Sequence, residues 1–271
     1  MSIWSSNTAT AKWRRWVYER VGDYNLNVLE GKVDGHSMVS IRGHDDTVPN
    51  GGPFGLSPSF GGSSYKFDQS AIAATPAAIS VASTDNTNDN SGGTGALTVR
   101  ITGLDANGDI QTVDETLTGT TKVTTSETWS AYHGHTVLTT GSNNSNTGTI
   151  WVGTGTFTGG IPAVRMGSME VGHNKSATGY YVVPAGHTLY LRQLVSTIAS
   201  SNKDVEISIE TSTDGAQWYI QGDFGIEAGD FTTPVIAIPG LVAGTHIQLE
   251  AKGSAASTVV TAILAGELVE D

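Results

Sequence analysis

The alternation of apolar and polar residues predicts a β-hairpin near the middle of the chain. From Leu97 to Thr102 the odd-numbered positions are apolar and the even-numbered ones polar, a period typical of a strand with one buried face. The polar link 105–109 contains Asn-Gly, which favours a hairpin turn, and the return strand runs from Ile110 to about Thr118. Its apolar positions change parity near Thr112, so we expect a β-bulge there.

Short strands of this kind recur along the chain, separated by turn residues. The cleanest alternation is Val205–Glu210, and Asp214-Gly215 after it predicts a tight hairpin turn. Many short strands at this spacing are typical of sandwiches and barrels. We therefore expect an all-β fold with two β-sandwich (jelly-roll-like) domains, at residues 61–168 and 169–271.

Residues 1–60 differ from the rest and are expected to form an extended N-terminal arm. The large side chains from Trp13 to Arg20 have helical spacing, which predicts a short helix in the arm. Residues 22–58 are irregular, and only Met38–Ile41 is strand-like. A link of this length without regular structure is unusual inside a compact domain, so we interpret it as an arm or a strap between subunits.

Four residues of the arm, Trp13, Arg14, Arg15 and Trp16, are the candidates for anchoring a partner. Tryptophan and arginine are enriched at the centres of protein interfaces, so this stretch favours docking on another protein. The alternative is a short helix whose apolar stripe packs on its own β-domain, which is the usual role of such a stripe.

Charge is distributed unevenly along the chain. Residues 1–42 carry six basic and four acidic side chains, and the remainder carries a net charge of −14, which gives −12 for the whole chain. The net charge of −14 on the remainder argues against a protein that wraps nucleic acid, because such a protein needs a basic surface. It favours a partner with a basic surface.

The absence of cysteine excludes a disulfide scaffold, a thiolate metal site and a cysteine nucleophile. No apolar run approaches the roughly 18 residues of a membrane span, so no membrane partner is expected. The N-terminus shows no secretory signal, and we expect a protein made in the cytoplasm.

Three clusters resemble metal sites, and we expect none of them to be one. Asp105-x-Asn107-x-Asp109 begins like a calcium loop but lacks its glycine and its bidentate glutamate, so a plain turn is expected. Residues 85–90 (DNTNDN) are expected to be a solvated loop. His133 and His135 share one side of a strand, but no third ligand is evident.

No arrangement of catalytic residues is recognisable. His36 and His44 lie near Asp45 and Asp46, but no nucleophile motif accompanies them. A pair of carboxylates for glycoside hydrolysis stays open, because its members can lie far apart in sequence. We expect a protein that is not an enzyme, with no catalytic residue, no cofactor and no metal.

Five aromatic residues are candidates for stacking on sugars. The alternative, which we favour, is packing in a core or an interface, since large aromatics supply much of the buried area of small β-domains. The five are Trp129, Tyr132, Trp151, Trp218 and Tyr219.

Several turns and strand patterns resemble a family of virion structural proteins of tailed bacteriophages, frequent in marine and environmental phages. The resemblance covers most of residues 30–271 and leaves the opening Trp4–Trp16 unmatched. Its motifs are Gly95–Val99, Gly103–Gly108, Glu115–Thr121, Tyr181–Leu191 and Ile247–Ala251.

The resemblance implies a structural particle component rather than an enzyme. We expect a capsid decoration (cement) protein, located in the virion and anchored by its N-terminal arm on the major capsid protein or on tail proteins. By analogy with decoration proteins we expect a homotrimer. The alternative is a tail, collar or fibre component that binds a host surface glycan.

Overall fold

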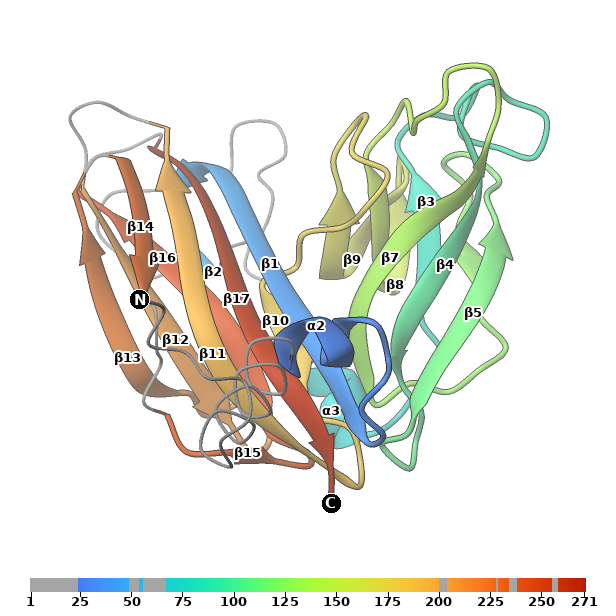
Figure 1. Cartoon of the computed structure of the whole chain (residues 1–271). Helices are drawn as coiled ribbons and strands as arrows, with labels where there is room; N and C mark the ends of the chain where they lie inside the picture. The colour runs from blue at the N-terminus through green and yellow to red at the C-terminus, as the bar shows by residue number, and fades with distance from the viewer. Residues whose placement is uncertain are drawn as a thin grey trace, which may run out of the picture.

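The computed structural model describes residues 24–48, 54–55, 67–199, 204–227, 229–233, 238–254 and 258–271. Strands account for 59% and helices for 4% of the structure, so the expected all-β class is confirmed. Two short helices are described, α2 (Tyr24–Leu29) and α3 (Ser70–Ala74). The strands form four sheets, arranged as two bodies that lie side by side in Figure 1.

The terminal body contains the two larger sheets, on the left in Figure 1. Sheet I has the order β1-β17-β11-β14, with β15 also paired to β11. Its strands are β1 (His36–Val48), β17 (Thr258–Glu270), β11 (His187–Ile198), β14 (Gly229–Thr233) and β15 (Leu241–Val242). Sheet II has the order β10-β16-β12-β13, with β2 also paired to β16. Its strands are β10 (Tyr180–Val182), β16 (His246–Gly253), β12 (Val205–Ser212), β13 (Tyr219–Ile226) and β2 (Phe54–Gly55).

One hydrophobic cluster lies between sheets I and II. It includes Ile41 and Leu264 from sheet I and Ile207, Ile209 and Leu249 from sheet II, all at most 3% exposed. The predicted alternation of Val205–Glu210 is confirmed on this side, because its apolar positions all belong to the cluster. Burial of these faces against each other is the main force that holds the two sheets together.

The central body, on the right in Figure 1, is formed by strands β3 to β9. Sheet III has the order β6-β3-β8-β9 and sheet IV the order β5-β4-β7. The strands of sheet III are β6 (Val123–Thr124), β3 (Ser80–Ser83), β8 (Ile150–Thr158) and β9 (Ile161–Met169). Those of sheet IV are β5 (Ile110–Thr116), β4 (Ala96–Leu104) and β7 (Ala131–Thr140). A second hydrophobic cluster lies between these sheets, with Trp129 and Tyr132 fully buried in it.

Strand β1 is the main difference from the sequence analysis, which placed residues 36–48 in an irregular link with only Met38–Ile41 strand-like; that short piece is confirmed as part of the strand. It pairs with β17 from His36 to Asp45, and again at Val48 after a register shift. Ile41 and Val48 enter the core of the terminal body. This part of the expected arm therefore belongs to sheet I, and the central body is inserted in sequence between β1 and β10. The boundaries at residues 60 and 168 stay predictions.

The central hairpin forms as predicted, but without the expected bulge near Thr112. The register of β4 and β5 is continuous from Thr98 opposite Thr116 to Leu104 opposite Ile110. The parity change needs no bulge, because Ile110 is 54% exposed and lies outside the core. In the turn, Gly108 adopts φ +84°, a conformation that glycine reaches without strain.

The irregularities lie instead where β4 pairs with β7, around Thr98 and Thr102. They change which side chain faces the core at the start of β4. Ala96 is fully buried in the central cluster, whereas Leu97 is only partly buried. Leu97 is therefore less buried than Val99 and Ile101, with which the alternation grouped it.

The segment 170–179 connects β9 to β10 and pairs with both bodies. The N–H of Ser176 donates to the carbonyl of His135 on β7 at 2.9 Å, and that of Gly179 donates to the carbonyl of Arg42 on β1 at 2.8 Å. A small apolar cluster adds to this junction, with Leu104 and Ala131 from the central body packed on Tyr180 and Val182. The two bodies are thus joined by backbone pairing as well as by side chains.

Candidate functional site

The carboxylate of Asp105 serves its own turn, as the sequence analysis expected. Its Oδ1 accepts hydrogen bonds from the N–H groups of Asn107 and Asp109 at 2.8 and 3.0 Å. These backbone hydrogen bonds, that from Asp109 first, lower the pKa of Asp105. Among the described residues, no group of three or more His, Asp or Glu side chains is arranged to hold a metal ion.

The loop 85–90 is solvated only in part, since Asn86 and Thr87 are exposed as expected but Asp89 is not. Asp89 is completely buried, and its Oδ1 accepts from the N–H of Ala96 and from the N–H and hydroxyl of Thr147. Its Oδ2 accepts from the hydroxyl of Ser83 and the N–H of Gly148. One carboxylate therefore ties together three segments of the central body, a role that sequence spacing did not reveal.

The two histidines of β7 serve packing. His133 stacks on Tyr181 with ring centroids 4.2 Å apart, and its Nε2 accepts from the N–H of Val182 at 3.3 Å. His135 is hydrogen-bonded through Nδ1 to the hydroxyl of Tyr132. Desolvation lowers the pKa of both imidazoles to about 3, so both are neutral near pH 7.

The histidines of the expected arm lie on β1 and also have structural partners. Nδ1 of His36 lies 2.8 Å from a carboxylate oxygen of Glu267, and Nδ1 of His44 lies 2.7 Å from the hydroxyl of Thr261. Both partners are on β17, so these contacts reinforce the pairing of the first and last strands.

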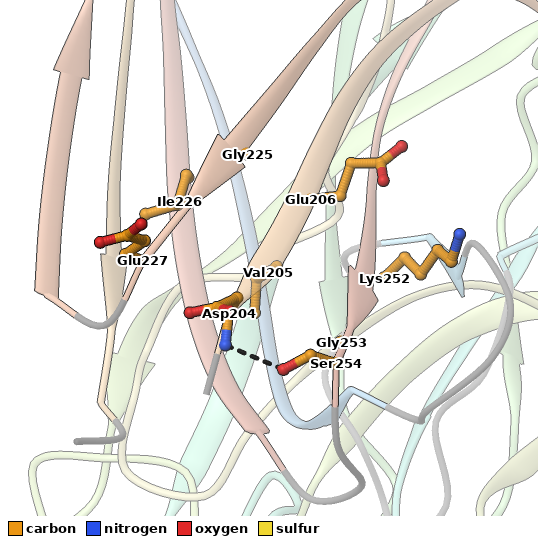
Figure 2. A pocket seen from close by; sticks show the side chains of 9 residues that line it. All are labelled: Asp204, Val205, Glu206, Gly225, Ile226, Glu227, Lys252, Gly253 and Ser254. Carbon is orange, nitrogen blue, oxygen red and sulfur yellow. Dashed lines mark hydrogen bonds between the residues drawn. The ribbon is translucent and has the colours of Figure 1, made fainter. Parts of the chain in front are cut away.

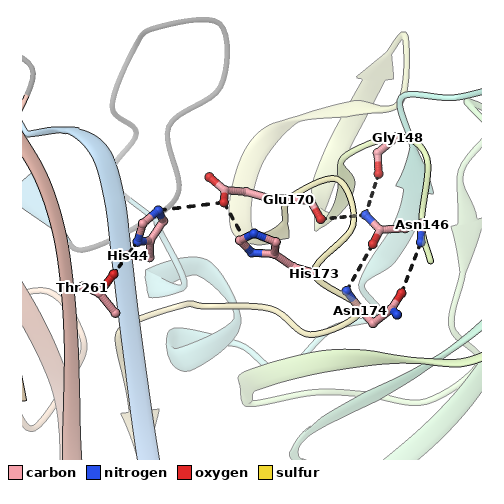
Figure 3. A network of polar contacts seen from close by, with 7 residues as sticks. All are labelled: His44, Asn146, Gly148, Glu170, His173, Asn174 and Thr261. Atoms are coloured by element: carbon pink, nitrogen blue, oxygen red, sulfur yellow. Dashed lines mark hydrogen bonds and ion pairs between the residues drawn. The ribbon is translucent and has the colours of Figure 1, made fainter. Parts of the chain in front are cut away.

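His44 also reaches the central body through Glu170, as Figure 3 shows. The carboxylate of Glu170 lies 3.9 Å from Nε2 of His44 and 3.4 Å from Nδ1 of His173. Beside it, Asn146 donates from Nδ2 to the backbone carbonyls of Gly148 and Glu170, each at 2.8 Å. This network fixes segment 170–179 against both bodies.

The five candidate stacking aromatics divide into two groups. Trp129, Tyr132 and Trp151 are completely buried, so the preferred alternative of core packing is confirmed for them. Trp218 is half-buried and Tyr219 is 59% exposed. Trp218 and Tyr219 alone of the five are therefore available to a ligand.

A hollow of about 450 Å³ lies at one end of sheet II (Figure 2). Glu206 and Lys252 face each other on β12 and β16, and Glu227 lies on the opposite side of the hollow. The N–H of Asp204 donates to the hydroxyl of Ser254 at 2.9 Å. In Figure 2 Asp204 and Glu227 lie on one side of the hollow and Glu206 and Lys252 on the other, so the charged side chains do not converge on one point and we assign no ligand to this hollow.

A second hollow, which we call the junction hollow, has a volume of about 480 Å³ and lies where α3 and the two bodies meet. Its aromatic wall is formed by Tyr180 and Trp218, whose rings meet edge to face with centroids 5.9 Å apart. The hydroxyl of Tyr180 is hydrogen-bonded to Nδ1 of His246. The ring of Trp218 is therefore held in place by a tyrosine that is itself fixed.

The polar wall of the junction hollow is formed by Asp68, Ser70 and Gln248. Nε2 of Gln248 donates to Oε2 of Glu210 at 2.7 Å and to Oε1 of Glu250 at 3.1 Å. Two carboxylates can accept only from the amide nitrogen, so they fix the orientation of the amide. Its carbonyl oxygen accepts no hydrogen bond from the described residues, and Gln248 as a whole is 5% exposed.

The sequence did not reveal the junction hollow, because the polar positions of sheet II beside it alternate with apolar ones, a pattern that predicts a face open to solvent. Ser208 and Glu210 alternate with buried isoleucines, yet they are only 7% and 8% exposed. The Asp214-Gly215 turn is also looser than the predicted tight hairpin, since β12 ends at Ser212 and β13 begins at Tyr219. That longer connection brings Trp218 to the hollow.

The candidate anchoring residues Trp13, Arg14, Arg15 and Trp16, and the predicted helix around them, lie outside the described residues.

No helix in the described part of the chain has the length and apolar character needed to cross a membrane.

Comparison with known proteins gives few neighbours. No family model matches the chain, and no curated protein does. Among solved structures, the chain is similar to the structure of infectious bursal disease virus, Gx strain, with 16% identity and a TM-score of 0.22 over 87% of this chain and 72% of that chain. It is also similar to the VP2 subviral particle of infectious bursal disease virus, with 11% identity and a TM-score of 0.17 over 91% and 82%. At these TM-scores neither similarity carries an argument about fold or function.

Proposed function

We propose that the chain is a non-enzymatic structural component of a tailed-phage virion, and specifically a capsid decoration protein. The observation that carries the proposal is the strand order of the terminal body, taken together with the resemblance of the sequence to phage virion proteins. Jelly rolls recur in viral capsid proteins and also in lectins and cupins. A jelly roll therefore supports a structural role in a particle.

The strand order of the terminal body supports interpreting it as a jelly roll. Counted along the chain from β1, with the short β2 and β15 left out, the eight strands fall four to a sheet, as 1-8-3-6 and 2-7-4-5. Only the connection from β12 to β13 stays within one sheet. Repeated crossing between two sheets is the arrangement that two Greek keys produce. The central body, with its own cluster between two sheets, fits a second sandwich.

The firm attachment of the two bodies also supports a structural role. Segment 170–179 pairs with both, and the network around Glu170 joins β1 to the central body. A component of a particle shell benefits from such rigidity, because an interface formed by preorganised surfaces loses less entropy on binding.

The uneven charge of the chain fits an arm that docks and a body that faces outward. Residues 1–22 carry four basic and one acidic side chain, a net charge of +3, and the rest of the chain carries −15. The arm would bind the major capsid protein through Trp13, Arg14, Arg15 and Trp16, and the bodies would associate as a homotrimer on the outer face of the virion. The chain would be made in the host cytoplasm and assembled there.

Reconstitution tests this proposal. Particles produced without this protein are mixed with the purified full-length chain, or with a variant that lacks residues 1–22, and are then sedimented. The full-length chain is expected to sediment with the particles, and the shortened chain to stay in the supernatant with an unchanged thermal unfolding profile. Equal sedimentation of both would contradict the anchor, and sedimentation of neither would contradict the particle role.

A further inference from the structure

The junction hollow has the features of a binding site for a small ligand. Pockets for such ligands are typically about 300–1,000 Å³, with aromatic walls and a few fixed polar groups. The hollow, at about 480 Å³, combines Trp218 and Tyr180 with the side chains of Asp68 and Gln248. These groups come from four separate segments of the chain, which the junction of the two bodies brings together.

The aromatic wall offers a rigid apolar surface, because the ring of Trp218 is only partly buried by its neighbours. Trp218 packs on the small cluster around Leu104 and Ala131, yet it keeps part of its surface exposed and lines the hollow. Its indole N–H has no hydrogen-bond acceptor among the described residues. A ligand with one apolar face and a hydrogen-bond acceptor at its rim would satisfy both features of this ring.

The polar wall accepts hydrogen bonds rather than donating them. The carbonyl oxygen of Gln248 is held in place by the two carboxylates on its amide nitrogen. Oδ1 of Asp68 accepts from the N–H and the hydroxyl of Ser70, which orients the carboxylate and leaves Oδ2 for a ligand. Fixed acceptors of this kind select a ligand that carries hydroxyl donors.

The charges around the hollow select against anions. Asp68 lines it, Glu210 and Glu250 lie directly behind Gln248, and none of its lining residues is lysine or arginine. A phosphate or carboxylate would be repelled there. A sugar ring is a ligand that meets these requirements, because it is neutral, has an apolar face and carries several hydroxyl groups.

We propose that the junction hollow binds a neutral sugar residue of a glycan, stacked on Trp218 and hydrogen-bonded to Asp68 and Gln248. This inference goes beyond the particle role and does not rest on it. A decoration protein and a tail or fibre protein are equally able to carry such a site. Failure of one proposal therefore leaves the other standing.

The test uses the purified full-length chain and the methyl glycosides of glucose, galactose, mannose and N-acetylglucosamine. Binding is measured by saturation-transfer NMR and calorimetry, with N-acetylneuraminic acid as the anionic comparison. At least one neutral probe is expected to bind with a Kd on the order of 1 mM or tighter, and the anionic probe is expected not to bind. Failure of all four neutral probes would overturn the proposal.

Three variants locate the binding. Trp218→Ala is expected to weaken binding at least about tenfold through the lost aromatic contact. Tyr219→Ala removes the neighbouring aromatic, which is 59% exposed and does not line the hollow, and is the matched control expected to bind like the wild type. Asp68→Asn keeps an acceptor for Ser70 and is expected to weaken binding about fivefold, because a hydrogen bond to a neutral amide is weaker than one to a carboxylate.

The variants Trp218→Ala and Asp68→Asn together decide whether the sugar binds in the junction hollow, even if one of them folds poorly. Trp218 also packs on the small apolar cluster, so its variant is checked by thermal unfolding. Asp68 is exposed, and its variant is expected to fold in any case. Unchanged affinity in Asp68→Asn, together with unchanged affinity in a folded Trp218→Ala, would place the sugar elsewhere and overturn the site.

Discussion

Ile41 on β1 lies directly opposite Leu264 on β17, so residues 223 positions apart in the sequence share one core. Both are at most 3% exposed and belong to the cluster between sheets I and II. The first described strand and the last strand of the chain therefore complete the same sheet. The terminal body depends on a segment that the sequence alone assigned to an arm.

The first prediction concerns this strand. Ile41→Ala is expected to lower the free energy of unfolding of the terminal body by about 2–4 kcal/mol, because it removes buried methyl groups and leaves a cavity. Leu29→Ala is the control, since that side chain is 66% exposed and should change stability by less than about 0.5 kcal/mol. Urea unfolding measures both, and equal stability of the two variants would place β1 outside the core.

The second prediction concerns the buried carboxylate of Asp89. Asp89→Ala removes the acceptor of five hydrogen bonds, and three of their donors, on Ser83, Ala96 and Gly148, stay buried. We expect a loss of about 3–5 kcal/mol from the central body. Asp109→Asn, at an exposed position of the hairpin turn, should cost less than about 0.5 kcal/mol. If the two variants have similar thermal unfolding profiles, Asp89 does not organise this loop.

The third prediction is a loss of stability in mild acid. Desolvation lowers the pKa of His135 to about 3, whereas an unfolded histidine titrates near 6.5. Between these values only the unfolded chain takes up the proton, so stability is fully present above about pH 6.5 and falls as the pH drops toward 3. The expected slope for this residue is about 1.4 kcal/mol per pH unit.

Urea unfolding at several pH values between 7 and 4 checks the histidine prediction. His133 has its pKa lowered by the same cause and adds to the slope. His135→Gln should flatten the dependence of stability on pH relative to the wild type. Identical slopes in the two proteins would mean that His135 is not held neutral in the fold.

The sequence predicted those features that depend on neighbouring residues. The hairpin around Gly108 and the inward face of β12 form as expected, because turn chemistry and a period of two are local properties. The pairing of β1 with β17 was missed. Residues 42–46 combine charges, a histidine and a glycine, which are poor strand formers, and the pairing comes from a strand more than 200 residues away.

The sequence also did not predict the junction hollow, and the reason is related. Glu210 and Gln248 occupy the polar positions of well-patterned strands, which normally face water. Here the face is covered, and both side chains are at most 8% exposed. Which polar face is covered depends on how the two bodies meet, and no periodicity within one strand contains that information.

The central proposal, that this chain decorates a phage capsid, is tested most directly by its copy number in purified virions of the proposed phage. Quantitative mass spectrometry compares the amount of the chain with that of the major capsid protein in the same particles. The account predicts a copy number of the same order as that of the capsid protein. Far fewer copies would contradict decoration and favour a tail, collar or fibre position, and absence from the particle would contradict the virion role itself.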